Sequence, residues 1–300
     1  MRILISGASG LVGNALTKAL GQCGHSVAHL VRPGRPLSEG DVRWDPAAAT
    51  VDVSGMEGAD AVVHLSGAGI ADGRWTGRRK AILRSSRLDS TRVLVNALAR
   101  MRQRPTVFVC ASAVGYYGDR GNEVLTESST PGRDFLALLA RDWEAEALRA
   151  ESGGTRTVLL RFGIILSAQA GALPRMLMPF KFFLGGRLGR GDQWMSWIGL
   201  EDAVTIARQA IEKGDLSGPL NVVAPNPVQN AEFTETARRV LHRPAVLRIP
   251  ASALRLALGE MAHPLLLASQ RVIPARLITM GHPFRCERLE PALTKILATA

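Results

Sequence analysis

Two neighbouring tyrosines are the side chains of this chain best suited to acid/base chemistry. Tyr116 and Tyr117 are its only tyrosines, and they lie in ASAVGYYGDRGNE, residues 111–123. A phenol transfers a proton readily when a nearby cation lowers its pKa, and a lysine four residues later on one helix face supplies that cation. Here Arg120 follows Tyr116 at that spacing, and Gly121 follows Tyr117. Glycines at every third position indicate a loop, so the segment is either a phenolic site or a packed loop beside a ligand.

A glycine-rich turn near the start of the chain is suited to binding phosphate. In ISGASGLVG, Gly7, Gly10 and Gly13 lie between a predicted strand, residues 2–6, and a predicted helix, residues 11–22. The first glycine permits a tight turn, the second a close approach to a pyrophosphate, and the third close packing of helix on sheet. The helix N-terminus offers free N–H groups to the anion. The pattern predicts dinucleotide binding; the alternative is a connection without a ligand.

The end of the second predicted strand bears on the choice of dinucleotide. The strand, residues 27–31, continues into RPGRP with Arg32 and Arg35, and the first carboxylate after it is Glu39. An acid at this place suits the ribose hydroxyl of NAD, whereas a guanidinium suits the 2′-phosphate of NADP. The sequence therefore favours NADP(H) over NAD(H), with a solvated loop arginine as the alternative for Arg32.

The elements that position these residues alternate between strand and helix in the first half of the chain. Near-continuous apolar strands alternating with helices indicate a parallel sheet covered on both faces. The predicted strands are residues 2–6, 27–31, 61–67, 106–112 and 156–163, and the longer helices end near 102 and span about 134–150. The second half is less regular, with a strand at 219–223 and helical sequence near 202–213, 231–241 and 251–281.

The charge balance narrows the class of partner. The chain of 300 residues has 37 basic and 26 acidic side chains, for a formal charge of +11. A basic protein attracts nucleic acid, lipid or a phosphorylated small molecule. Aromatic residues make up only 5% and no nucleic-acid motif is present, so the small molecule is favoured. We expect no specific nucleic-acid partner, and no membrane partner because the apolar stretches are shorter than the roughly 20 residues of a spanning helix.

Cysteine and histidine usage indicates neither a disulfide framework nor a metal site. Cys23, Cys110 and Cys286 are far apart and form no ligand pattern, which favours a reducing cytoplasm. His25 and His29 flank a predicted strand, where their spacing does not bring two ring nitrogens together. We expect a cytoplasmic monomer or homodimer without a bound metal.

Several longer runs resemble a known superfamily. VVHLSGAG, ASAVGYYG, QWMSWIGLEDAV and IADGRWTGRRKAILRSSRLDSTRVLV are similar to the atypical, epimerase-like branch of the extended short-chain dehydrogenase/reductases, an NAD(P)-dependent epimerase/dehydratase-like family. The resemblance covers nearly the whole chain. It implies an α/β fold: a Rossmann-type doubly wound parallel sheet with a smaller, mostly C-terminal α/β substrate domain. The implied cofactor domain covers 1–165 with a returning segment at about 195–225, and the substrate domain covers 166–194 and 226–300.

The same resemblance implies which positions meet the cofactor. Arg32 meets the adenosine phosphate, and Ala111 approaches the nicotinamide side together with Ser112, a catalytic candidate beside Tyr116 and Tyr117. Arg87 stands where typical members have an asparagine, which puts the usual role of that position in doubt. The remaining implied cofactor residues are Gly7, Ser9, Gly10, Leu11, Val12 and Gly13 at the pyrophosphate, His64, Ser66, Gly67 and Ala68 at the adenosine and ribose, and Phe162 and Gly163 near the nicotinamide amide.

This chain departs from the superfamily at the pair of residues that typical members use as acid and base. Typical members carry Tyr-x-x-x-Lys on the helix before LLRFG, but alignment by the acidic end of that helix puts Leu136 and Ala140 at the two positions. Neither side chain transfers a proton. Two hypotheses follow: an NADP(H)-dependent epimerase/dehydratase-like oxidoreductase with altered chemistry, or an NADP(H)-binding regulatory or interaction protein without turnover.

The segment PFKFFLGGRLGRGDQWMSWIGLED supplies candidates for a substrate site. Aromatic walls with a few charges are usual in small-molecule sites. Lys181 and Arg187 suit an anionic or sugar-like substrate, and Trp194 and Trp197 suit its walls. The alternative is a surface loop in which both tryptophans pack inside the protein.

Overall fold

The computed structural model describes residues 1–298, which form two compact units. Each unit is built from three stretches of the chain, so neither is continuous in sequence. Unit 1 comprises Met1–Ser112, Leu139–Leu160 and Val204–Leu220, and unit 2 comprises Ala113–Leu138, Arg161–Ala203 and the described residues from Asn221 onward.

An eight-stranded sheet, with the order β13-β8-β6-β5-β1-β2-β3-β4, confirms the Rossmann-type prediction. Its central strand β1 pairs in parallel with β2 and β5, and β5 pairs in parallel with β6. Ile3, Leu4 and Ile5 of β1 are fully buried, as an apolar run in the middle of a parallel sheet should be. The strands are β1 (Arg2–Ser6), β2 (Ser26–Val31), β3 (Val42–Asp45), β4 (Thr50–Val51), β5 (Ala61–His64), β6 (Val107–Ala113), β8 (Arg156–Phe162) and β13 (Gly218–Val222).

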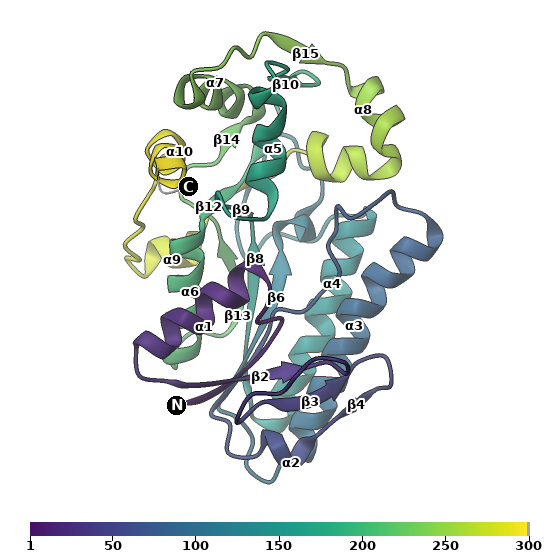
Figure 1. Cartoon of the computed structure of the whole chain (residues 1–300), viewed down its shortest axis with the longest axis vertical. Helices are drawn as coiled ribbons and strands as arrows, with labels where there is room; N and C mark the ends of the chain where they lie inside the picture. The colour runs from purple at the N-terminus through teal and green to yellow at the C-terminus, as the bar shows by residue number, and fades with distance from the viewer. Residues whose placement is uncertain (299–300) are drawn as a thin grey trace. The chain divides into compact units, whose positions relative to one another are not determined.

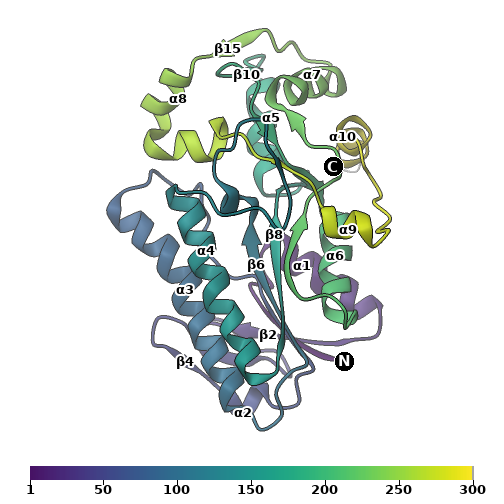
Figure 2. The same cartoon turned by 180° about the vertical axis from the view of Figure 1, so that it is seen from behind.

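Helices cover both faces of this sheet, so the doubly wound prediction is also confirmed. In Figures 1 and 2, α1 (Leu11–Gln22) and α6 (Leu200–Glu212) lie on one face. The long helix α3 (Gly77–Arg100) and α4 (Phe135–Leu148) lie side by side on the other. A short helix, α2 (Val53–Met56), precedes β5.

Two strands of this sheet were not expected from the sequence. β3 pairs in parallel with β2, and β4 pairs antiparallel with β3. They are four and two residues long, and Trp44 of β3 is buried. Such short runs lack the length that makes an alternating pattern recognisable.

Unit 2 is built from short elements around its own apolar cores. One core joins α5, β12, α7 and α10 through buried side chains that include Leu173, Trp197, Phe233 and Leu293. The helices are α5 (Ala172–Lys181), α7 (Asn230–Leu241), α8 (Ala251–Leu258), α9 (Ala275–Thr279) and α10 (Leu289–Ala298), with a 3₁₀-helix at Val114–Tyr117. The strands are β7 (Val124–Leu125), β9 (Ile164–Leu166), β10 (Gly186–Leu188), β11 (Trp194–Met195), β12 (Trp197–Gly199), β14 (Val228–Gln229), β15 (Leu247–Ile249) and β16 (Arg271–Val272).

The prediction of predominantly helical sequence from 251 to 281 is confirmed, with α8, a 3₁₀-helix at Gly259–Met261, a π-helix at His263–Leu267 and α9 in this range, but the helical sequence is interrupted. Helix α8 ends at Gly259, whose φ of 65° is left-handed, and strand β16 separates it from α9. A second interruption is Pro274, which directly precedes α9. The apolar periodicity therefore arises from several short packed elements rather than from one helix.

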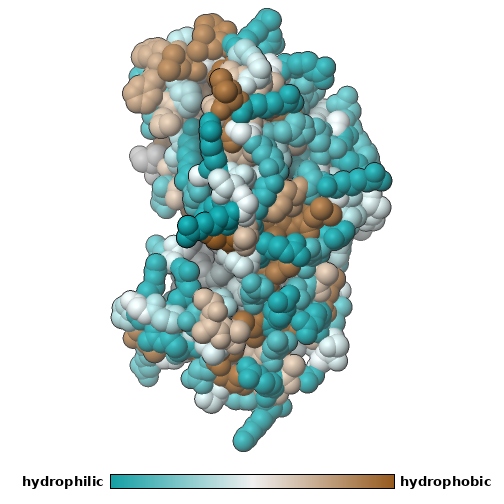
Figure 3. Space-filling view, turned by 90° about the vertical axis from the view of Figure 1, so that its right-hand side faces the viewer, coloured by the Kyte–Doolittle hydropathy of each residue, from teal (hydrophilic) through white to brown (hydrophobic). Residues whose placement is uncertain are grey.

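Figure 3 shows apolar side chains at the surface at the top of the view, where β15 and α8 lie.

Candidate functional site

The glycine turn after β1 has the backbone geometry that its sequence predicts. Gly7 has a φ of 76°, and its carbonyl accepts a hydrogen bond from the Gly10 N–H at 2.9 Å. A Cβ at Gly7 would lie 2.7 Å from the carbonyl carbon of Leu65. A Cβ at Gly13 would lie 2.3 Å from the Gly7 carbonyl oxygen. Both contacts are too close for any side chain, so two of the three glycines are required by the fold of the turn itself.

The N-terminus of α1 is open for an anion. Gly10 is its N-cap residue, and among residues 1–298 no side chain caps it and no acid lies in its first turn. Ser9 and Gly10 are exposed, while Leu11 and Val12 are half-buried. The first N–H groups of a helix have no partner within the helix, and they favour negative charge. This turn fits a pyrophosphate, because its backbone supplies donors and no Cβ closes the approach at Gly10.

An arginine that the sequence analysis missed organises the loop after β2. Arg43 of β3 donates from Nη1 to the carbonyl oxygens of Arg32 at 3.2 Å and Arg35 at 3.0 Å. Arg32 and Arg35 are exposed. The neighbouring Asp41 carboxylate accepts the backbone N–H groups of His29 and Ser38 at 2.8 and 2.9 Å, so it is engaged within the loop. The loop thus exposes the guanidinium groups of Arg32 and Arg35 directly after β2, with the exposed Glu39 further along the loop.

The loop after β5 is fixed by side chains of α3. Ala68 donates its N–H to Ser86 Oγ at 3.1 Å, and its carbonyl accepts from Arg87 Nη2 at 3.1 Å. Gly67 lies against the same guanidinium, since a Cβ there would be 3.3 Å from Arg87 Cζ. Ser66, which the resemblance also places at the adenosine and ribose, is half-buried in this loop. Arg87 therefore supports this loop through its guanidinium group.

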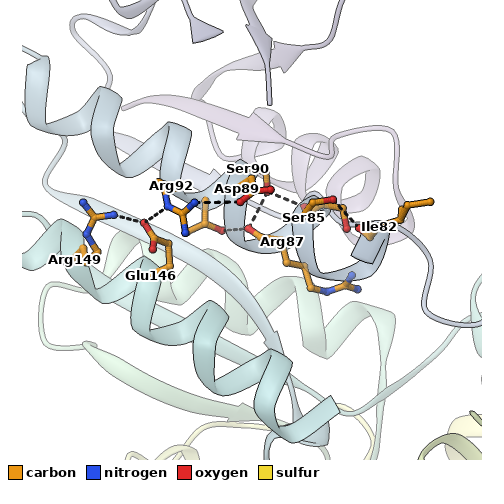
Figure 4. Close-up of polar contacts among 10 residues, drawn as sticks. Ile82, Ser85, Arg87, Asp89, Ser90, Arg92, Glu146 and Arg149 are labelled. Carbon is orange, nitrogen blue, oxygen red and sulfur yellow. Dashed lines mark hydrogen bonds and ion pairs between the residues drawn. The ribbon is translucent and has the colours of Figure 1, made fainter. Parts of the chain in front are cut away.

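Arg87 keeps its charge although it is largely buried. Burial, reinforced by the positive charge of Arg79, lowers the pKa of Arg87 to about 10. Its guanidinium lies 5.3 Å from the ring centroid of Trp143 on α4. Figure 4 shows Arg87 and Ser90 on α3, and Glu146 of α4 between Arg92 and Arg149. The two helices are thereby linked at both buried and exposed positions.

The side chain of His64 lies in the interior of unit 1. Its side chain is fully buried at the end of β5, with Nδ1 2.6 Å from Ser6 Oγ and Nε2 3.1 Å from Ser90 Oγ. Burial, and secondarily the charge of Arg87, lowers the pKa of His64 to about 3, so the ring is neutral at physiological pH. Any contact of His64 with a cofactor is thereby limited to its backbone.

The buried imidazole predicts a characteristic acid sensitivity. Its contribution to stability is fully present above the ordinary histidine pKa of 6.5 and is lost as the pH falls toward about 3, because only the unfolded chain binds the proton. Between these values we expect the free energy of unfolding to fall by about 1.4 kcal/mol per pH unit from this group. Urea titrations from pH 7 to 4 measure this slope, which His64→Leu should remove and His242→Asn should retain. An unchanged slope in His64→Leu would show that the acid sensitivity does not come from the buried imidazole of His64.

Ser112 donates a hydrogen bond to a buried carboxylate. Its Oγ lies 2.5 Å from Glu144 Oε1 of α4, and both side chains are buried in unit 1. Glu144 was not selected from the sequence, where it is one of several acids near the end of a helix. Ala111, at the end of β6, is half-buried beside it. The contact fixes the direction of the Ser112 proton and leaves the oxygen lone pairs to accept a donor.

Tyr117 is held inside unit 2. It is fully buried, donates its hydroxyl to Asn221 Oδ1 at 2.7 Å, and accepts from Arg161 Nη1 at 2.9 Å. Burial raises the pKa of Tyr117 to about 12, although Arg161 and Asn221 act in the opposite direction. The phenol therefore stays protonated and ties three segments of unit 2 together.

Tyr116 is the more accessible of the two phenols. It is half-buried, packs edge-to-face on Tyr117 with centroids 5.3 Å apart, and lies under the guanidinium of Arg161, which is 3.6 Å from its ring centroid. Arg120, the cation suggested by spacing, instead bonds Glu123 at 2.6 and 2.8 Å. Arg161 is therefore the cation at the tyrosines, and no short-range spacing in the sequence indicates it.

The two positions of the missing acid/base pair are apolar and packed. Leu136 lies against Gly115, where a Cβ would be 3.5 Å from the leucine Cβ. Ala140 is buried in unit 1. Neither side chain has a titratable group, so these contacts contribute packing only.

The structure places the four predicted substrate residues in different environments of unit 2. Lys181 is exposed at the end of α5, and Arg187 of β10 is half-buried. Trp194 is half-buried, donates from Nε1 to Asn122 Oδ1 at 2.9 Å, and lies under the guanidinium of Arg271. Trp197 is 2% exposed and belongs to an apolar core, so its role is packing.

Phe162 and Gly163 lie in unit 2 where the chain leaves β8. Phe162 is half-buried. Gly163 donates its N–H to the Val222 carbonyl at 3.1 Å, and a Cβ there would be 2.6 Å from the Ser196 carbonyl oxygen. This close backbone approach explains the glycine without reference to a ligand.

Two further searches bear on the kind of site. Within residues 1–298, His, Cys, Asp and Glu side chains form no group of three or more that could hold a metal ion. In the same part of the chain, none of the helices combines the length and apolar character needed to cross a bilayer.

Comparisons with known proteins agree with this architecture. A model of the NAD dependent epimerase/dehydratase family matches residues 3–223, and a domain of unknown function, DUF1731, matches residues 249–296. An epimerase family protein of Mycobacterium leprae is 43% identical over 292 residues, which cover 97% of this chain and 94% of that one.

Two solved structures are similar over the whole chain. The human epimerase family protein SDR39U1 with NADPH has a TM-score of 0.90 and 33% identity, with 100% of both chains covered. A nucleoside-diphosphate sugar epimerase from Corynebacterium glutamicum has a TM-score of 0.82 and 37% identity, covering 100% of this chain and 58% of that one. By its sequence match and its fold, the chain belongs to the NAD dependent epimerase/dehydratase family.

Proposed function

We propose that this protein binds NADP(H) on unit 1 and acts as an epimerase/dehydratase-like oxidoreductase on a small substrate. The observation that carries the proposal is the turn after β1, where Gly7 and Gly13 have no room for a Cβ and Gly10 opens an uncapped helix. The backbone N–H groups of Leu11, Val12 and Gly13 would hold the pyrophosphate.

The loop after β2 supports NADP(H) over NAD(H). Arg32 and Arg35 are exposed, their carbonyls are held by Arg43, and Asp41 is occupied by backbone donors. A guanidinium binds the 2′-phosphate of NADP(H) through two parallel hydrogen bonds. The ribose hydroxyl of NAD(H) at the same place cannot form this pair of bonds. The human relative with 33% identity was solved with NADPH, which supports the same preference.

The catalytic candidates are Ser112 and Tyr116. When bound, the nicotinamide supplies or accepts hydride; the chain's own groups orient the substrate and hold protons. Ser112, oriented by Glu144, would accept a hydrogen bond from a substrate hydroxyl. Tyr116, whose phenol is the more accessible of the two, would donate a proton to the substrate. Tyr117 and Arg161 hold that phenol in place. Lys181, Arg187 and Trp194 would meet an anionic or sugar-like substrate.

A second candidate function is NADP(H)-dependent regulation without turnover. Leu136 and Ala140 at the usual pair, and the buried, protonated phenol of Tyr117, favour it. A substrate screen followed by NADPH absorbance separates the two. Turnover that falls in Ser112→Ala and Tyr116→Phe, with unchanged NADPH affinity, supports the enzyme; binding without turnover across sugar nucleotides and acidic sugars supports regulation.

Replacing Arg32 by alanine tests the cofactor assignment. We expect the Kd for NADPH to rise about tenfold while that for NADH is unchanged, because a charge-assisted hydrogen bond to an exposed phosphate contributes about 1.5 kcal/mol. Fluorescence titration of both reduced coenzymes measures this. Arg100→Ala, an exposed arginine at the end of α3, is the matched control and should leave both values unchanged. An equal loss for NADPH and NADH in Arg32→Ala would show that Arg32 does not meet the 2′-phosphate.

A further inference from the structure

Unit 2 exposes large apolar side chains on two neighbouring segments that also carry positive charge. Three consecutive side chains after α5, Phe182, Phe183 and Leu184, are 68%, 58% and 57% exposed. On the neighbouring segment Val246 is 81% and Leu256 is 82% exposed. We name these five residues, with Arg243, Arg248 and Arg255, the apolar-basic surface. A soluble domain rarely exposes so many large apolar side chains together without a binding function.

The backbone of the turn holds these side chains outward. Phe183 donates its N–H to the Phe180 carbonyl at 3.0 Å, and Leu184 donates to the Pro179 carbonyl at 2.8 Å. Phe183 itself has a φ of 61°, which is left-handed and unfavourable for a large side chain. Such a conformation persists only where the surrounding structure fixes it. The turn therefore presents its apolar side chains as a fixed feature.

Contacts within unit 2 join the two segments into one surface. β10 and β15 pair in parallel, with Gly186 opposite Leu247. A Cβ at Gly186 would lie 2.3 Å from the Leu247 carbonyl oxygen, so the two backbones are in direct contact. The guanidinium of Arg243 lies 4.9 Å from the ring centroid of Phe183. Figure 3 shows brown surface at this end of unit 2, bordered by teal side chains.

The charge of the two segments has one sign. Residues 171–190 contain four Arg or Lys side chains, residues 241–259 contain three, and neither segment contains Asp or Glu. The carboxylates nearest in sequence are Glu260, directly after the second segment, and Asp192, which pairs with Arg190 at 2.8 Å. With these two acids included, the two segments carry seven basic and two acidic side chains, so their net charge is positive.

We propose that the apolar-basic surface docks this protein on the surface of an anionic lipid bilayer. The phenylalanines and leucine of the turn would enter the boundary between headgroups and acyl chains, and the arginines would meet lipid phosphates. The basic side chains beside the exposed apolar ones favour an anionic bilayer as the occupant of this surface. The sequence analysis favoured a small molecule over lipid and expected no membrane partner; the exposure of the apolar side chains, which composition does not reveal, is the reason to propose a peripheral contact.

Co-sedimentation with lipid vesicles tests the proposal. Full-length protein is mixed with vesicles of phosphatidylcholine alone or of phosphatidylcholine and phosphatidylglycerol in equal amounts. We expect binding to the anionic vesicles, weakened by salt, and little to the neutral ones. Phe182→Ser with Phe183→Ser should abolish binding, and Arg255→Glu should weaken it by at least about fivefold. Circular dichroism of both variants checks that the fold is retained.

Matched controls place equivalent changes elsewhere. Ile278→Ser removes an apolar side chain that is 50% exposed on α9, and Arg78→Glu makes the same charge change at the start of α3. Both should bind like the parent protein. Equal binding to neutral and anionic vesicles, or equal binding by all variants, would overturn the proposal. No vesicle binding, together with self-association that the double serine variant abolishes in sedimentation velocity, would assign the surface to a second copy and overturn it as well.

Discussion

Gly13→Ala is expected to destabilise unit 1 by about 2–3 kcal/mol, because the added methyl group overpacks a site without free volume. Its Cβ would lie 2.3 Å from the Gly7 carbonyl oxygen and 2.8 Å from Ala8 Cα. Both neighbours are backbone atoms, so relief requires α1 to move away from the turn. That shift displaces the N–H groups proposed to hold pyrophosphate, and we expect NADPH affinity to fall about tenfold or more.

Gly21→Ala in the same helix is the matched control. No atom lies within 4 Å of a Cβ built at Gly21, among those considered in residues 1–298. Alanine is the better helix former by about 0.5–1 kcal/mol, so this variant should be slightly more stable and bind NADPH normally. Urea unfolding and NADPH fluorescence titration of both variants decide the matter. If Gly13→Ala keeps both properties, the turn does not have the close packing described above.

Arg161→Met is expected to cost unit 2 about 3 kcal/mol of unfolding free energy, because it leaves buried polar partners without their cation. Arg161 is 3% exposed and donates to the Tyr117 hydroxyl at 2.9 Å and to the Glu127 carbonyl at 3.3 Å. It also covers the ring of Tyr116. Methionine retains the length of the side chain, so the loss reports mainly on the charge and its hydrogen bonds.

A double-mutant cycle with Tyr117→Phe separates this network from general packing loss. Because Tyr117 and Arg161 share a hydrogen bond, the combined variant should cost less than the two single changes added together, by about 1 kcal/mol. Arg141→Met, at an arginine whose side chain is 52% exposed on α4, should change stability by less than about 0.5 kcal/mol. Strict additivity of Arg161→Met and Tyr117→Phe would show that the two side chains do not act together.

The cation at the tyrosines also connects stability with the proposed chemistry. Arg161 fixes Tyr117 by a hydrogen bond and Tyr116 by its position over the ring. If Tyr116 takes part in turnover, Arg161→Met should therefore lower the rate by displacing the phenol even at temperatures where the protein stays folded. The NADPH titration of the same variant tells loss of substrate chemistry from loss of cofactor binding.

Local patterns in the sequence determined the sheet and the glycine turn after β1. The apolar runs at 2–6 and 107–113 form central strands, and Gly7, Gly10 and Gly13 form the predicted turn. These features depend on steric limits and burial within a few residues, so periodicity and glycine spacing reveal them. The short strands β3 and β4 were missed because two to four residues carry no recognisable period.

Only the tertiary structure decided which polar groups meet. Glu144 reaches Ser112 across 32 residues, Arg161 reaches Tyr117 across 44, and Arg43 fastens the loop of Arg32. A hydrogen bond requires its two atoms within about 3 Å and in a favourable direction. Sequence spacing fixes such geometry along one helix or strand, but between elements it depends on how the chain packs. For that reason the residues of the glycine turn were predictable, whereas the partners that orient the serine and the tyrosines were not.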